Sequence, residues 1–235
     1  MGKIILVINP GSTSTKLAIY DDGMILRSDK VVHPAEELKK FKGVWDQYQF
    51  RLEVINKWVD ENITHCSAVV SMGGLLRPVR GGVYLVNQKM INDARGNLQG
   101  EHASNLGCVM AYEISKRFSC SALVADPVSV DEFEPLAFYS GHPHIKRRPL
   151  SHALNIHATA RRAARELNVN YNLSAFIICH LGGGISIAPV RNGMIIDVND
   201  ASSDGPYSPE RTGGLPLQPF ITLAMSGKYT EPELR

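Results

Sequence analysis

The sequence has few of the features that mark secreted, membrane-spanning or nucleic-acid-binding proteins. Its 4 cysteines are scattered and form no Cys-x-x-Cys pair, so neither a zinc site nor a disulfide framework is indicated. A formal net charge of +2 over 235 residues gives no general attraction to nucleic acid or to an anionic membrane. No apolar run approaches the roughly 20 residues that a membrane-spanning helix needs.

The start of the chain also lacks the pattern of a secretory signal. Met1-Gly2-Lys3 leads directly into a strand-like apolar segment rather than into a signal peptide. The cysteines are typical of small buried hydrophobic residues in a reducing compartment. We therefore expect a cytoplasmic protein with no nucleic-acid or membrane partner.

What the sequence does contain is the composition and the alternation of elements of an α/β protein. Hydrophobic residues make up 44% and charged residues 20%, which are ordinary globular values, and the length suffices for one large domain or two smaller ones. Apolar spacing predicts helices over 34–40, 46–63, 102–118 and 151–167, the last with Ser151 as its N-cap. Short apolar runs predict strands over 67–71, 83–87 and 122–125.

The segment ILVINPGSTSTKLAIYDDG, residues 5–23, predicts a strand, a turn rich in hydroxyl groups and a second strand. It is not a P-loop, because Lys16 is not preceded by glycine and the residues after it indicate a strand rather than a helix. A hairpin tip can nevertheless bind phosphate, since Gly11 lets the backbone approach closely and turn amides form a concave anion site. The alternative is a solvated turn whose hydroxyls bond their own backbone.

The segment FIICHLGGGISIAPVRNGMII, residues 176–196, repeats this order with glycines in place of the hydroxyls. In both segments a strand, a tip and a strand are followed by a short turn, Asp22-Gly23 or Asn192-Gly193, and a further apolar run. Such an internal repeat is the plan of the actin-like (ribonuclease H-like, ASKHA) kinases, in which two related domains clamp a nucleotide. We therefore predict an α/β fold with two ribonuclease H-like domains, residues 1–150 and 151–235.

Several motifs together resemble one family over the whole chain. They are INPGSTSTK, GGLLRPV, GEHASNLG, ADPVSVDE, HALN, HLGGGIS, IDVNDAS and GPYSPERTGGLP. This combination resembles the butyrate kinases of the acetokinase family, whereas acetate kinases typically lack the proline in the first loop. The resemblance implies reversible transfer of the γ-phosphoryl group of ATP, with Mg²⁺, to a short-chain carboxylate such as butyrate, giving ADP and an acyl phosphate.

The resemblance also implies the residues of the site. Arg211 matches the arginine that contacts the phosphoryl oxygens, and His180 and His152 match histidines near that group. Asp126 matches the aspartate that helps to hold Mg²⁺. The nucleotide phosphates would be bound by Asn9, Gly11, Ser12, Thr13 and Ser14 in the first tip and by Gly182, Gly183 and Gly184 in the second.

Without the family, each of these residues has a structural alternative. Arg211 would be a surface arginine in a loop, His152 and His180 satisfied structural histidines, and Asp126 the cap of the following turn. The group Glu101, His102, Ser104 and Asn105 indicates a helix start, although His102 or Asn105 would be able to line a cleft.

The chain departs from the family at residue 72. The family usually has Gly-Arg-Gly-Gly before Leu-Leu, whereas this chain has Ser71-Met72-Gly73-Gly74. The missing arginine resembles, by its position, a ligand of the substrate carboxylate or its phosphate, and methionine supplies no charge. Arg77 and Arg80 are candidate replacements. We therefore expect weakened turnover, since a charged hydrogen bond to a phosphoryl group typically contributes several kcal/mol in the transition state.

A second departure concerns the last residues of the sequence. Thr230-Glu231-Pro232-Glu233 is a capping box that predicts a helix start. Family members continue from here with more helices, a strand, an adenosine-binding segment and a glutamate that assists Mg²⁺. The resemblance therefore implies that the second domain is incomplete in this chain and that one face of its sheet is poorly covered. A truncated product, a longer protein or a partner chain that completes the fold would each explain this.

Two other functions are considered beside the kinase. One is a non-catalytic remnant or binding subunit that keeps the phosphate tips without turnover. Another is an actin-like kinase for a sugar or glycerol, which is disfavoured because nothing beyond Asp126 offers the base that a hydroxyl acceptor needs. Homo-oligomers formed through the completed second domain are a further expectation from the family.

Overall fold

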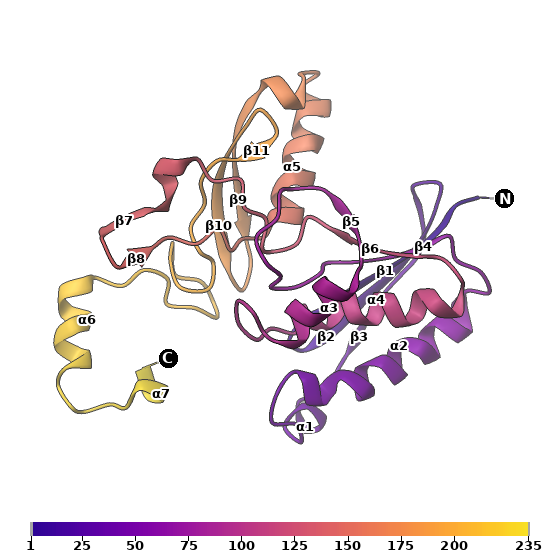
Figure 1. Ribbon diagram of the computed structural model, residues 1–235, viewed down its shortest axis with the longest axis horizontal. Coiled ribbons are helices and arrows are strands. Elements are labelled where there is room, and N and C mark those ends of the chain that lie inside the picture. The colour runs from indigo at the N-terminus through magenta and orange to yellow at the C-terminus, as the bar shows by residue number, and fades with distance from the viewer. Residues whose placement is uncertain (1, 235) are drawn as a thin grey trace.

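The computed structural model describes residues 2–234. Met1 and Arg235, the first and last residues of the two predicted domains, lie outside the described residues. Its larger body is a six-stranded sheet in the order β3-β2-β1-β4-β6-β5 (Figure 1). The strands are β1 Ile4–Pro10, β2 Ser14–Asp21, β3 Met24–Val32, β4 Ala68–Ser71, β5 Val83–Leu85 and β6 Ser121–Ala125. Adjacent strands β3-β2-β1 are antiparallel, β1-β4-β6 are parallel, and β5 is antiparallel to β6.

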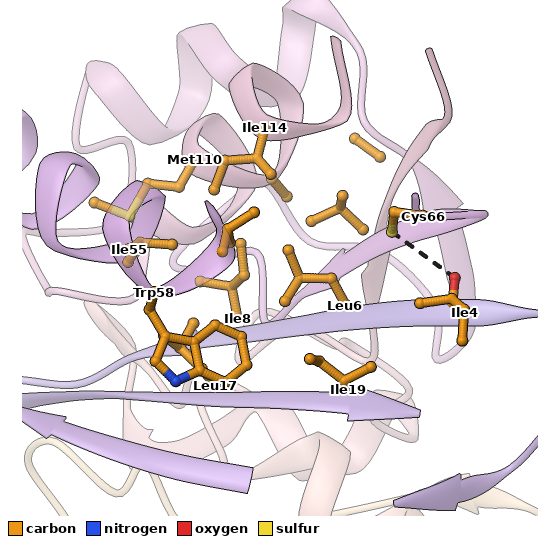
Figure 2. Packing of buried hydrophobic residues seen from close by; sticks show 14 of the residues in the cluster. Ile4, Leu6, Ile8, Leu17, Ile19, Ile55, Trp58, Cys66, Met110 and Ile114 are labelled. Carbon is orange, nitrogen blue, oxygen red and sulfur yellow. Dashed lines mark hydrogen bonds between the residues drawn. The ribbon is translucent and has the colours of Figure 1, made fainter. Parts of the chain in front are cut away.

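The alternating side chains of β1 explain why this sheet carries a helical layer. Leu6 and Ile8 are fully buried and point to the side on which α2 (Tyr48–Asn62) and α4 (Asn105–Arg117) pack, as Figure 2 shows for the core around Ile55 and Met110. The hairpin between β2 and β3 closes at Asp22-Gly23, whose φ angles of 44° and 87° suit an Asp-Gly turn. The helices expected at 46–63 and 102–118 and the strands expected at 67–71 and 122–125 are thereby confirmed within a few residues.

The region between β5 and α4 differs from the sequence prediction. The strand expected over 83–87 ends at Leu85, and Asn87 instead caps a helix, α3 (Gln88–Arg95), by accepting a hydrogen bond from the Met90 N–H at 3.0 Å. Asparagine is among the best N-cap residues, since its side-chain oxygen satisfies an N–H that has no partner within the helix. The short helix expected over 34–40 is α1, Ala35–Leu38.

The smaller body is a three-stranded sheet, β11-β10-β9, covered on one face by α5. Its elements are α5 Ala153–Glu166, β9 Ala175–Leu181, β10 Ile185–Arg191 and β11 Met194–Ile195. Ile156 and Ala160 of α5 meet Ile178, Ala188 and Val190 of the sheet. This core also takes in residues 130–138, which precede the boundary near residue 150 that the sequence suggests, and that boundary stays a prediction.

The start of α5 corrects a second sequence prediction. Ser151 is not the N-cap: His152 occupies that position, and its side chain makes no capping hydrogen bond. The Ser151 hydroxyl is buried, and no hydrogen-bond partner for it lies among residues 2–234. The imidazole of His152 is instead hydrogen-bonded to Ser186 of β10, which ties the start of the helix to the sheet.

The second face of the small sheet is open, as the sequence predicts. The outward residues of β9 are exposed: Ile177 and Leu181 by 75% each, and Cys179 between them, which pairs with Ile187 of β10. The helices α6 (Leu217–Ala224) and α7 (Glu231–Leu234) contain no buried residue and lie apart from this face (Figure 1). The helix start predicted by the capping box is confirmed, with one of the two hydrogen bonds of the box: the Glu233 carboxylate accepts from the Thr230 N–H, while the Thr230 hydroxyl donates to the same carboxylate and the Glu233 N–H donates to the Thr230 carbonyl.

The remaining elements are short. They are the 3₁₀ turns η1 Trp45–Gln47, η2 Pro135–Phe138 and η3 Tyr171–Leu173, and the two-stranded ribbon β7 Tyr139–His142 and β8 Ile145–Lys146. Among residues 2–234, no helix combines the length and the apolar character needed to cross a membrane.

Candidate functional site

A cavity of about 330 Å³ lies where the two bodies meet. The larger body contributes Met72 and Leu75, which follow β4, and residues 99–102, which precede α4. The smaller body contributes residues around the start of α5 and, from the segment after β11, Ala201, Ser202 and Arg211. The wall thus contains two of the residues expected in the site, His152 and Arg211.

Arg211 lies against the glycine tip between β9 and β10. A Cβ added to Gly184 would collide with the guanidinium group of Arg211 and would approach His152 Cε1 to 3.3 Å. None of the three tip glycines has a positive φ in the left-handed region, so space rather than backbone freedom explains their identity. The tip is held by the Ser208 hydroxyl, which donates to the Gly183 carbonyl at 2.6 Å.

His152 and His180 form a stacked pair beside this tip. Their ring centroids are 3.8 Å apart and their planes differ by 9°. His152 Nδ1 lies 2.9 Å from the Ser186 hydroxyl, and His180 Nδ1 lies 3.0 Å from Asn155 Oδ1. Burial and the neighbouring charges lower the pKa of His152 to about 4, and burial lowers the pKa of His180. Both rings are therefore neutral at neutral pH, and each has a single N–H. In His180 this N–H is used, because the Asn155 oxygen only accepts, whereas the Ser186 hydroxyl can donate to His152 Nδ1 and leave the Nε2–H of His152 for a ligand.

The hydroxyl-rich tip between β1 and β2 is hydrogen-bonded through its carbonyl groups to an arginine that the sequence did not single out. Arg51 of α2 is fully buried and donates to the carbonyls of Gly11 at 2.8 Å and of Ser12 at 2.7 Å. The Gly11 N–H donates to the Ser14 carbonyl at 2.8 Å, so the other N–H groups and the hydroxyls of the tip are those that would serve an anion. The signal in the sequence was the spacing of residues 51, 55, 58 and 59, which places an arginine on the apolar face of the helix.

His102 lies within electrostatic range of the arginines beside both tips. It lines the cavity, and its Nδ1 lies 2.8 Å from the Ser104 hydroxyl. Its pKa is lowered first by burial and then by the positive charges of Arg211, beside the second tip, and Arg51, beneath the first. The sequence pattern around His102 predicts a helix start. This is confirmed, because Asn105 is the first residue of α4.

The remaining expected residues lie outside the wall of this cavity. They are Asn9, Gly11, Ser12, Thr13 and Ser14 of the first tip, Gly182, Gly183 and Gly184 of the second, and Asp126 and His180. The second tip still contacts two wall residues directly, as described above. That both tips hold one nucleotide stays a prediction.

The chain resembles curated butyrate kinases along nearly its whole length. It is 47% identical over 235 residues to the probable butyrate kinase 2 of Caldanaerobacter subterraneus and 45% identical over 234 residues to butyrate kinase 2 of Clostridium acetobutylicum. Each match covers 98% of this chain. This chain belongs to the butyrate kinase family. It spans 66% of the length of these relatives, and no family model matches it.

Solved structures of related kinases support the fold. The Porphyromonas gingivalis acetate kinase superposes with a TM-score of 0.68 at 14% identity, and the match covers 99% of this chain and 66% of that one. A propionate kinase from Francisella tularensis gives a TM-score of 0.64 at 16% identity, with 99% and 66% covered. The two-domain actin-like architecture expected from the sequence is therefore shown for this butyrate kinase family member.

Asp126, the expected Mg²⁺ ligand, is buried and already has two partners. Its Oδ1 accepts the Gly82 N–H at 2.6 Å, and its Oδ2 lies 3.2 Å from the guanidinium group of Arg161. A carboxylate can accept further bonds, and Mg²⁺ often takes only one or two protein carboxylates together with substrate phosphates and water. Within residues 2–234, no group of three or more His, Cys, Asp or Glu side chains is arranged to hold a metal. Mg²⁺ binding at Asp126 therefore stays a prediction.

Met72 lies in the cavity wall, where the family arginine would stand. Neither suggested replacement lines this cavity. Arg77 is engaged with the buried carboxylate of Asp93 at 2.5 Å, outside the wall. The arginines that do line the cavity are Arg148 and Arg211, and Arg148 was not identified from the sequence.

Proposed function

We propose that this chain carries the site of a butyrate kinase-type carboxylate kinase, which transfers the γ-phosphoryl group of ATP to a short-chain carboxylate and also runs in reverse. The observation that carries the proposal is the packing of Arg211 and of a stacked, neutral histidine pair against the glycine tip, at the edge of a small cavity. Family membership supports the same reaction.

The proposed chemistry needs little proton transfer. A carboxylate oxygen is already anionic at neutral pH, so it attacks the γ-phosphorus directly, the new O–P bond forms in line, and the bond to the bridging oxygen of ADP breaks. Catalysis then depends on alignment and on neutralising charge on the transferring group. Arg211 would bind the phosphoryl oxygens through its planar fork, and the Nε2–H of His152 would donate a hydrogen bond to them. His180, whose N–H is used by Asn155, would stack on His152 beside this group and hold its ring in place.

The nucleotide would be gripped by the two tips. Asn9 and residues 11–14 would offer hydroxyls and N–H groups to the phosphates, and residues 182–184 would offer backbone N–H groups at close range. Asp126 would help to hold Mg²⁺, which neutralises phosphate charge when bound. A cytoplasmic location and assembly into homo-oligomers remain predictions from the family.

Acyl phosphate formation tests the proposal. The chain is incubated with ATP, Mg²⁺ and butyrate, and hydroxylamine traps butyryl phosphate as the coloured hydroxamate. We expect product with the natural sequence, at least about 100-fold less with Arg211→Gln because a preorganised cation is lost, and little change with Arg77→Gln, which alters an arginine outside the cavity. Absence of hydroxamate from well-folded protein contradicts the proposal.

Met72 favours a second candidate, a binding subunit without turnover. An apolar side chain replaces a cation in the cavity wall, which removes charge where the family has it. In that case ATP would still protect the chain against thermal unfolding, while the hydroxamate assay would give no product. Clear turnover excludes this candidate.

A further inference from the structure

The two guanidinium groups in the cavity wall, of Arg148 and Arg211, donate hydrogen bonds to two residues that are adjacent in the chain, Asp200 and Ala201. Arg148 donates to Asp200 Oδ2 from Nε at 3.1 Å and from Nη2 at 2.7 Å. Arg211 donates from Nη1 to the carbonyl oxygen of Ala201. Since their anchors are adjacent in the chain, both guanidinium groups are held in the same part of the wall.

Asp200 is fixed firmly enough to define where Arg148 lies. Its side chain is 7% exposed, and its Oδ1 accepts the Ser202 N–H at 2.9 Å and the Ser202 hydroxyl. If Arg148 left this partner, a buried carboxylate would lose its counter-charge, which is costly. The Arg148 side chain is nevertheless 49% exposed, and within residues 2–234 its Nη1 has no hydrogen-bond partner. One edge of the fork is therefore available to a ligand.

The rest of the wall is suited to an apolar chain. Met72, Leu75, Val128 and Leu150 contribute aliphatic side chains. The carboxylate in the wall is that of Glu101, whose Oε1 accepts a hydrogen bond from the Val44 N–H at 3.1 Å. A volume of about 330 Å³ is at the lower end for small-molecule sites, so the cavity suits a small ligand. A cationic end and an aliphatic wall together select a short aliphatic acid.

We propose that Arg148, positioned by Asp200, binds the carboxylate of the substrate and supplies the positive charge that Met72 does not. This inference rests on the proposed function, and it names the cation that orients the acceptor. Arg211 remains for the transferring phosphoryl group, so each anionic partner has its own guanidinium.

Binding of butyrate alone, without ATP, tests the role of Arg148. The dissociation constant is measured with the full chain by calorimetry or by NMR titration, and butyramide, which has the same shape without the charge, serves as the second ligand. Arg148→Gln keeps a hydrogen-bond donor for Asp200 while removing the charge. We expect it to weaken butyrate binding about tenfold or more, because a charged hydrogen bond is lost, and to leave butyramide binding unchanged.

Arg77→Gln is the matched control. Arg77 is 43% exposed and pairs with Asp93, which is 8% exposed, so the pair resembles Arg148 and Asp200 but lies outside the cavity. We expect its butyrate affinity to stay within about twofold of the natural chain. Arg148→Lys, which keeps the charge and is the safer variant if Arg148→Gln does not fold, should fall between the two.

Two results overturn the inference. One is unchanged butyrate affinity in folded Arg148→Gln, and the other is equal loss of butyrate and butyramide binding, which would indicate a packing role. The hydroxamate assay separates this from the proposed function. Butyrate binding that depends on Arg148 without hydroxamate formation supports the inference and contradicts the kinase, whereas turnover with an unchanged KM for butyrate in Arg148→Gln does the reverse.

Discussion

The two hairpin tips share a strand–tip–strand plan but differ in where their functional side chains come from. The first tip carries its own hydroxyls, and Arg51 of α2 stabilises it by donating hydrogen bonds to the carbonyls of Gly11 and Ser12. The second tip has no side chains, and the space is taken by its neighbours, with Arg211 and His152 against Gly184. One tip therefore supplies functional groups, and the other supplies room for groups from elsewhere in the chain.

The support beneath the first tip should give the largest effect. Arg51→Met leaves the carbonyls of Gly11 and Ser12 without their buried donors, so we expect a loss of about 3 kcal/mol in the free energy of unfolding. Urea denaturation measures it. Arg117→Met is the control, since Arg117 lies on the surface and pairs with Asp60, and should cost about 1 kcal/mol or less. Equal losses in the two variants would show that the tip does not depend on Arg51.

The absence of side chains from the second tip should affect turnover rather than stability. Gly184→Ala pushes the Arg211 guanidinium from its place, and because its end is flexible the fold can adjust while the positioned charge is lost. We expect kcat to fall about 100-fold with the melting temperature nearly unchanged. In the first tip, Gly11→Ala meets only the Ser14 carbonyl oxygen at 3.2 Å, and its effect on kcat should be clearly smaller. The comparison fails if Gly11→Ala is the more harmful change.

The charge missing from the cavity wall gives a smaller expected effect. Met72→Arg places a cation where the family has one, and we expect the rate of hydroxamate formation to rise about tenfold, equivalent to one charged hydrogen bond. Met72→Leu keeps the wall apolar and should leave the rate close to that of the natural chain. An unchanged rate for Met72→Arg in an active preparation would show that the wall does not lack a charge at this point.

The buried histidines near the tips should give the smallest effect, a dependence of stability on pH. Burial lowers the pKa of His33, beside the first tip, and of His152, beside the second, from the usual 6.5 to about 4. The unfolded chain therefore binds protons that the folded chain excludes, so the free energy of unfolding should decrease as the pH falls from about 6.5 to about 4. His33→Gln should flatten this slope, and His65→Gln, which alters an exposed histidine, should not. Identical slopes in both variants would contradict this assignment.

Local patterns predicted most of the elements, and they failed where two uses of a residue compete. Asn87 follows an apolar run, which favoured a longer strand, yet its side chain caps α3. Ser151 has the chemistry of an N-cap, but the contact between His152 and Ser186 shifts the helix start by one position. In each case a side-chain hydrogen bond decided a boundary that hydrophobic spacing leaves open.

The candidate site divides in the same way. Motifs identified Arg211, His152, His180 and the two tips, because these residues lie in short characteristic segments. The sequence offered His102 as one of two residues able to line a cleft, and the cavity wall contains it. Arg51 and Arg148 became visible only in three dimensions. Arg51 reaches the first tip across 40 residues of sequence, and Arg148 finds Asp200 across 52.

The sequence by itself determined the two strand–tip–strand units, since alternating apolar residues and Asp-Gly or Asn-Gly turns act over a few neighbouring positions. Only the tertiary structure decided which charges surround the cavity. A guanidinium group is placed by the buried carboxylate or carbonyl that binds it, and those partners come from distant segments that meet only when both cores have formed.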